Sequence, residues 1–105
     1  MLEQKTITLP ELADLCHQYN WLSVHMYDKS GNKGVSVRFS TKTVVSIVRG
    51  ERIPCFMVTD GLNSFVIEGD SFTMTIKEQH NADAYKFMSF TLQCDDFCCT
   101  MHLIA

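Results

Sequence analysis

The sequence has no long apolar run and no apolar leader. None of its 105 residues belongs to an apolar stretch of eighteen or more, so we expect no membrane-spanning helix. The first six residues lack the apolar core of a signal peptide. Internal repeats, low-complexity stretches and linkers are also missing. We therefore expect a single domain over residues 1–105 that resides in the cytosol, without contact to a membrane.

Recognisable catalytic motifs are missing as well. None of the four histidines stands in a motif that places it beside a nucleophile. The segment Lys29–Gly34 contains two glycines and two lysines, but not in the spacing of a phosphate-binding loop. The carboxylate pair Asp95-Asp96 is explained by a tight turn, because Asp tolerates turn conformations. We expect no enzymatic activity and no cofactor.

Potential metal ligands crowd together in the last twelve residues: Cys94, Cys98, Cys99 and His102. A zinc site needs three or four such groups within about 2.0–2.3 Å of one ion. In a strand, Cys98 and His102 share a face but lie roughly 13 Å apart. Cys94 and Cys99 are diagonal neighbours on an apolar face, where a redox couple is a minor alternative. We expect inert, packed thiols and no metal site.

The charge is divided unevenly along the chain, although the net charge is only −3. Residues 29–52 carry a balance of +5, whereas the segments before and after them carry −3 and −5. Such a segment can steer an acidic partner. We predict a binding surface formed by Arg38, Lys42, Arg49 and Arg52. In the alternative interpretation, these charges belong to solvated side chains on loops, and their uneven distribution along the chain is incidental.

One helix is marked by its boundaries. Thr8 and Glu11 have the spacing of a capping box, Pro10 lies in the first turn, and Asn20 is a plausible stop. The apolar residues recur at helical spacing between them. They are Leu9, Leu12, Leu15, Cys16 and Tyr19.

The pattern of the rest of the chain predicts strands. Matching apolar residues across each pair predicts hairpins that join residues 22–26 to 35–39, 65–68 to 71–76, and 87–94 to 97–104. Thr43–Val48 is apolar on both faces and is expected to be a central strand, while Cys55–Thr59 turns back through Asp60-Gly61. The expected fold is α+β, with an N-terminal helix packed on an antiparallel β-meander of about eight short strands.

These patterns favour a small non-enzymatic protein-binding module that acts by occupying a partner surface. Small strand-rich chains without a catalytic motif are common among phage and mobile-element proteins that inhibit a host enzyme, so an inhibitor of a host defence nuclease is one form of this hypothesis. The expected partner is a protein with an acidic or nucleic-acid-like surface. Direct nucleic-acid binding is disfavoured, because the chain is acidic overall and Phe39 beside the basic segment is assigned to the core.

Two other functions remain open. One is a zinc- or redox-responsive protein that uses Cys94, Cys98, Cys99 and His102, and the other is a small-ligand binder in a curved sheet. We also expect a homodimer, because a long antiparallel meander leaves an edge strand that this short chain can hardly cover.

Overall fold

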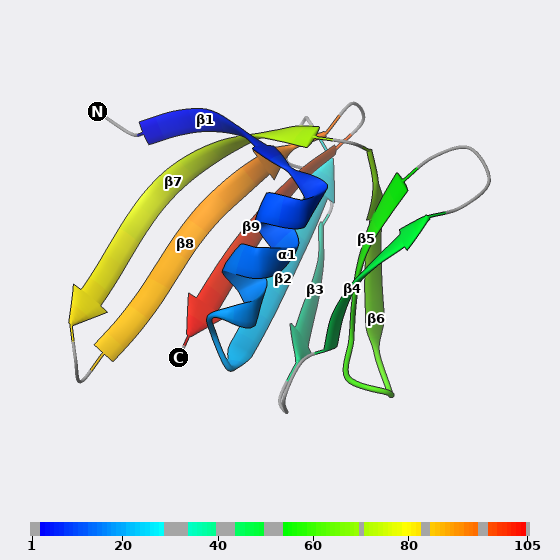
Figure 1. Cartoon of the computed structure of the whole chain (residues 1–105), viewed down its shortest axis with the longest axis horizontal. Helices are drawn as coiled ribbons and strands as arrows, with labels where there is room; N and C mark the ends of the chain where they lie inside the picture. The colour runs from blue at the N-terminus through cyan, green and yellow to red at the C-terminus, as the bar shows by residue number, and fades with distance from the viewer. Residues whose placement is uncertain are drawn as a thin grey trace.

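The computed structural model describes the chain except for residues 1–2, 29–33, 40–43, 50–53, 70, 83–84, 95–96 and 105. For residues 44–49, 54 and 85 it describes the backbone alone. The described part forms one helix and nine strands, which are arranged in two antiparallel sheets (Figure 1). The expected α+β class, with mostly antiparallel strands and one short helix, is confirmed at this level.

The larger sheet has six strands in the order β1-β7-β8-β9-β2-β3. Their bounds are β1 (Glu3–Thr8), β7 (Ser71–Ala82), β8 (Tyr85–Gln93), β9 (Phe97–Ile104), β2 (Trp21–Asp28) and β3 (Gly34–Phe39). The smaller sheet has the order β4-β5-β6, with β4 (Val44–Arg49), β5 (Pro54–Thr59) and β6 (Ser64–Glu68). Because β1 pairs with β7 and β2 pairs with β9, the chain is not a simple meander.

The helix α1 (Leu9–His17) is capped as its sequence predicts, but it is not N-terminal. The Glu11 amide donates to the Thr8 hydroxyl at 3.4 Å, and the Thr8 amide donates to the Glu11 carboxylate at 3.0 Å. The strand β1 precedes this cap and pairs with β7. The sequence gives little sign of β1, since only Ile7 among its six residues is buried.

The core lies around α1 and between the two sheets. The buried residues of α1 belong to one cluster with buried residues of both sheets, among them Phe56 and Ile67 of the smaller sheet and Phe90 and Leu103 of the larger one. The helix contacts β1, β4 and β5, and Figure 1 shows it in front of one face of the larger sheet. No helix in the described ranges has the length and apolar character needed to cross a membrane.

Two of the expected hairpin registers are confirmed. Leu22, Val24 and Met26 lie opposite Phe39, Val37 and Val35. Met88, Phe90 and Leu92 lie opposite Leu103, Met101 and Cys99. The return of β5 into β6 is also present, with Asp60 accepting hydrogen bonds from the amides of Leu62 and Asn63 at 2.9 and 2.8 Å.

The expected hairpin between residues 65–68 and 71–76 is wrong. The strand β6 pairs with β5 in the smaller sheet, whereas β7 pairs with β1 and β8 in the larger one. The chain therefore passes from one sheet to the other near Gly69, whose φ of 141° suits glycine. Likewise β4, which covers the strand expected at Thr43–Val48, lies at an edge, and β5 is the central strand of its sheet.

Candidate binding surface on the outer face of the larger sheet

The larger sheet presents a second face that points away from α1, which we call the outer face. Side chains alternate between the faces of a strand, so the neighbours of buried core residues point outward. Along β9, Met101 and Leu103 are fully buried, while His102 is half-buried and Ile104 is 40% exposed. The outer face is therefore open to solvent in this region.

Two rows of side chains cross this face at one end of the sheet. In the first row, Phe87 of β8 lies opposite Ile104 of β9, and Ile104 lies opposite Trp21 of β2. In the second row, Ser23 lies between His102 of β9 and Arg38 of β3. We call these six residues the outer-face patch.

The outer-face patch surrounds a hollow of about 540 Å³. Its walls include all six residues of the patch, together with Leu22 and Phe39. The volume falls in the range of sites that accept a small molecule or an anchoring side chain. The walls of the hollow are mostly apolar, and Ser23, His102 and Arg38 contribute a hydroxyl, an imidazole and a guanidinium.

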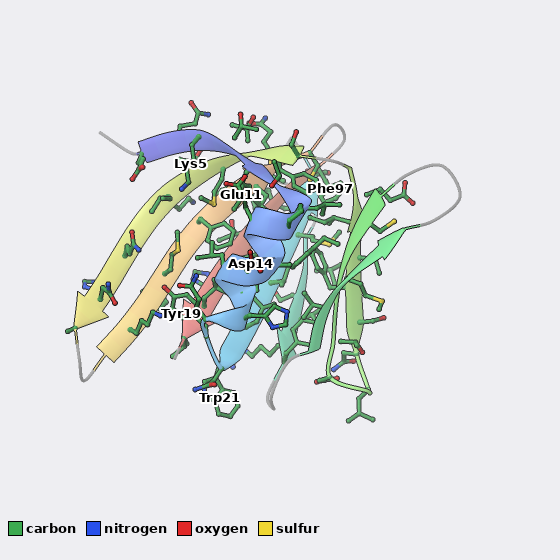
Figure 2. The ribbon with its side chains drawn as sticks, in the orientation of Figure 1. Lys5, Glu11, Asp14, Tyr19, Trp21 and Phe97 are labelled. Carbon is green, nitrogen blue, oxygen red and sulfur yellow. The ribbon has the colours of Figure 1, made fainter. Side chains whose placement is uncertain are left out.

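Two of its apolar side chains, Trp21 and Ile104, are exposed, whereas Phe87 is half-buried. Trp21 is 47% exposed, and Figure 2 shows it at the start of β2, pointing away from the body of the molecule. The Phe87 ring stacks on the His102 ring, with 6.1 Å between the ring centres. The amide of Asn20 donates to the carbonyl of Ile104 at 3.0 Å, which holds the start of β2 against the end of β9. The two chain segments that carry Trp21 and Ile104 are therefore fixed relative to each other.

Arg38 is the permanent charge among the described residues that line this hollow. Its side chain is exposed, as its position opposite Ser23 predicts, and it forms no ion pair with any described residue. Of the other predicted binding residues, Lys42 and Arg52 lie outside the described residues. Arg49 ends β4 opposite Pro54, with only its backbone described. Among the predicted binding residues, Arg38 is the one whose side chain the structure describes, and it lies beside the hollow.

The cysteines of the C-terminal strands separate onto different faces. Cys99 is buried in the core, while Cys98 and Cys94 are half-buried. Burial, with a smaller contribution from Cys94, raises the pKa of Cys99 well above its usual range, and burial alone raises the pKa of Cys16 to about 12. Thiols in this state are poor nucleophiles at neutral pH. No disulfide joins the five cysteines, and no group of three metal-ligating side chains occurs in the part of the chain that the structure describes.

A serine–histidine pair occurs elsewhere on the outer face. His25 of β2 shares a hydrogen bond with Ser36 of β3, which is the contact that a nucleophile and its base make. Both side chains are exposed, and neither lines the hollow at the outer-face patch. The serine–histidine contact is therefore separate from the hollow at the outer-face patch.

The apolar part of the patch was missed by the sequence reasoning, which singled out charges. One signal was present: the predicted register of the last hairpin continues to Phe87 opposite Ile104, on the face that is otherwise polar. The sequence could not place Trp21 in this patch, because the pairing of β2 with β9 joins strands that are far apart in the sequence.

In comparisons with known proteins, no family model, no curated protein and no solved structure matches the chain. Its function is therefore inferred from the geometry of its surface.

Proposed function

We propose that the chain is a non-enzymatic protein-binding module and that the outer-face patch is its binding surface. The observation that carries the proposal is a hollow on the larger sheet where Trp21 stays 47% exposed and Arg38 lines the same walls. Neither the packing of the core nor the polar character of the rest of this face accounts for an exposed tryptophan there. Contiguous exposed apolar side chains mark interaction sites more often than isolated ones do.

The chemistry of the patch indicates the kind of partner. Tryptophan and arginine are the residues most enriched at the energetic centres of protein interfaces. The hollow accepts an apolar or aromatic side chain, which contacts Trp21, Phe87 and Ile104. Arg38 favours a carboxylate next to that side chain, because a guanidinium pairs with a carboxylate through two parallel hydrogen bonds. A nucleic acid fits less well, since the described residues that line the hollow carry one permanent positive charge.

The proposal is tested by affinity capture from cells that carry the gene, followed by binding measurements on purified components. Wild-type protein, Trp21→Ala, Arg38→Glu and Val66→Ala serve as baits. Val66 is a matched control because it is 48% exposed and lies on β6 of the other sheet. We expect a protein that wild type and Val66→Ala retain in equal amounts, with at least a tenfold loss for Trp21→Ala, as for a central interface residue.

Arg38→Glu tests the charge separately. It should slow association with the captured protein, and the wild-type rate should fall as added salt shortens the Debye length to about 8–10 Å. Equal binding by all four baits, or binding without any dependence on Trp21, would exclude the outer-face patch as the binding surface.

Two finer expectations from the sequence stay predictions. If the captured protein is a nuclease, its activity should fall in proportion to the bound fraction, as for an inhibitor that occupies its surface. Self-association is measured by light scattering on the pure chain. A mass of 12.0 kDa at micromolar concentration would exclude the dimer.

A further inference from the structure

A stretch of backbone at the other side of the larger sheet has no strand beside it in the described part of the chain. The strand β1 pairs with β7 only as far as Glu3 opposite Ile76. Beyond that point the register of β7 with β8 shifts, and along Lys77–Ala82 the strand β8 is the only described strand that pairs with β7. All six residues of this extension are exposed. We call the backbone of Lys77–Ala82 on the side that no described strand pairs with the free edge of β7; the name refers to strand pairing and not to the side chains.

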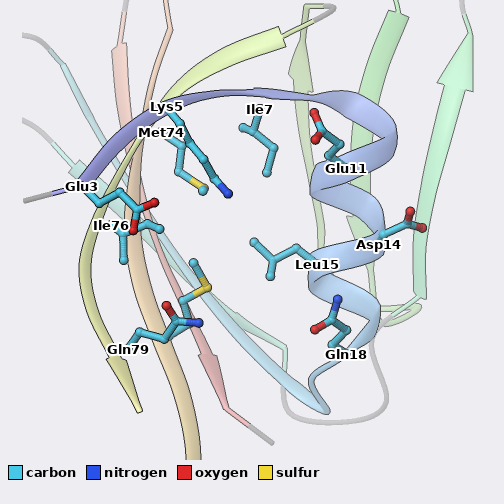
Figure 3. A pocket seen from close by; sticks show the side chains of 11 residues that line it. Glu3, Lys5, Ile7, Glu11, Asp14, Leu15, Gln18, Met74, Ile76 and Gln79 are labelled. Carbon is cyan, nitrogen blue, oxygen red and sulfur yellow. The ribbon is translucent and has the colours of Figure 1, made fainter. Parts of the chain in front are cut away.

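A cleft opens next to this edge, on the face of the sheet that carries α1 (Figure 3). It has a volume of about 390 Å³ and lies between α1 and the strands β1, β7 and β8. Its floor is apolar, with Met74 and Met88 almost fully buried and Leu15 half-buried. Ile76 and Gln79, which lie on either side of the register shift, line it as well. The cleft and the free edge are therefore contiguous.

The rim of the cleft is predominantly acidic. Among the described residues, Glu3, Glu11 and Asp14 line it together with one cation, Lys5, and all four side chains are exposed. Figure 3 shows the carboxylate of Glu3 and the ammonium of Lys5 turned toward the cleft. The hydrogen bond from the Thr8 backbone lowers the pKa of Glu11 further below neutral pH, where a Glu carboxylate is already charged. The balance at this rim favours a positively charged ligand.

We propose that an extended peptide adds to the free edge of β7 as a further strand and inserts an apolar side chain, flanked by basic ones, into the cleft. Added strands of this kind gain affinity from main-chain hydrogen bonds, and their selectivity comes from pockets that accept alternate side chains. The free edge supplies the backbone groups, the apolar floor accepts one side chain, and Glu3 and Asp14 attract its neighbours. This surface is separate from the outer-face patch and does not depend on the function proposed for it.

The probe is the peptide TKTLTKT with both ends blocked, in which the lysines and the leucine share one face when the chain is extended. Its acidic counterpart TETLTET has the same length, β-propensity and leucine. In an NMR titration of the full chain we expect TKTLTKT to shift the amide signals of residues 77–82, with at least threefold weaker binding of TETLTET. The amides of 77–82 should also exchange more slowly when the peptide is bound.

The variant Glu3→Lys should weaken TKTLTKT about threefold, as expected when one exposed charge pair is lost and replaced by repulsion. Glu68→Lys makes the same change of charge at an exposed position of β6 and should leave binding unchanged. If Glu3→Lys does not fold, Asp14→Lys on α1 makes the equivalent test. Equal binding of the two peptides, shifts outside 77–82 and the cleft, or no shifts at millimolar peptide would overturn the proposal. None of these outcomes affects the outer-face patch, because Trp21 lies on the other face.

Discussion

The two faces of the larger sheet are built by the same strands but differ in what occupies their alternate positions. On the face toward α1, which we call the inner face, Phe90, Leu92 and Met101 are fully buried. On the outer face, their neighbours Thr91 and Thr100 are half-buried, with 3.5 Å between their hydroxyl oxygens. The inner face is covered by the core of the protein, whereas the outer face is mostly polar.

The outer-face patch is the exception on the second face. Trp21, Phe87 and Ile104 are apolar where the alternation calls for polar residues, and α1 does not cover them. An apolar residue on the inner face is explained by stability. The same residue on the outer face needs another explanation, and binding to a partner supplies it.

The largest expected difference between the faces is in stability. Phe90→Ala removes a fully buried ring from the inner face and should lower the free energy of unfolding by about 3–5 kcal/mol. Thr73→Ala, at an exposed outer position of β7, should change it by only about 0.5 kcal/mol. Urea unfolding of both variants measures this difference, and similar values would mean that the two faces are not packed as described.

Cys98 and Cys99 allow the same comparison of the two faces within the strand β9. Cys99→Ser places a hydroxyl in the core and should cost about 1–3 kcal/mol, because a buried hydroxyl without a partner is unfavourable. Cys98→Ser, on the half-buried outer position, should be nearly neutral. The measurement is again urea unfolding, with zinc analysis of the untreated protein as a control. Stoichiometric zinc that is lost in Cys98→Ser would argue for a metal site instead of inert thiols.

The helix cap should matter less than the core. Thr8→Ala removes the hydroxyl that accepts from the Glu11 amide, and should destabilise the chain by about 1 kcal/mol. Thr8→Ser keeps an acceptor and should retain most of the stability. Thermal unfolding of the pair makes the test, and identical midpoints for Ala and Ser would show that the cap contributes nothing.

A pH dependence of a size similar to that of the cap is also expected. The folded chain holds the pKa of Cys16 at about 12, above its usual 9.0, so the folded state retains a proton that the unfolded state loses. The stability is therefore complete well below pH 9.0 and decreases as the pH rises toward 12, by about 1.4 kcal/mol at pH 10. Comparing the unfolding of wild type and Cys16→Ala at pH 8 and pH 10 isolates this thiol. An equal loss in both proteins would assign the dependence to other groups.

The sequence predicts those parts of the fold in which apolar residues match across neighbouring segments. The registers of β2 with β3 and of β8 with β9 are correct for this reason. The same criterion fails for β6 and β7, because alternation shows which face of a strand is apolar but not which strand lies beside it. The strand β1 has a single buried residue, Ile7, so its sequence carries no alternation to detect.

The candidate site was predictable only in part. The outward position of Arg38 follows from the register of its hairpin. The hollow beside it requires three strands, β8, β9 and β2, and its tryptophan enters through the pairing of β2 with β9. That contact is set by the tertiary arrangement of the sheet, which a local pattern does not contain.

The most direct test of the outer-face patch uses the fluorescence of Trp21, the only tryptophan of the chain. In the isolated protein, acrylamide should quench this emission readily, because the side chain is 47% exposed. Addition of the captured partner should shift the emission to shorter wavelength and protect it from the quencher, with Val66→Ala behaving like wild type. A partner that binds at saturation while Trp21 remains as accessible as in the free chain would contradict the account.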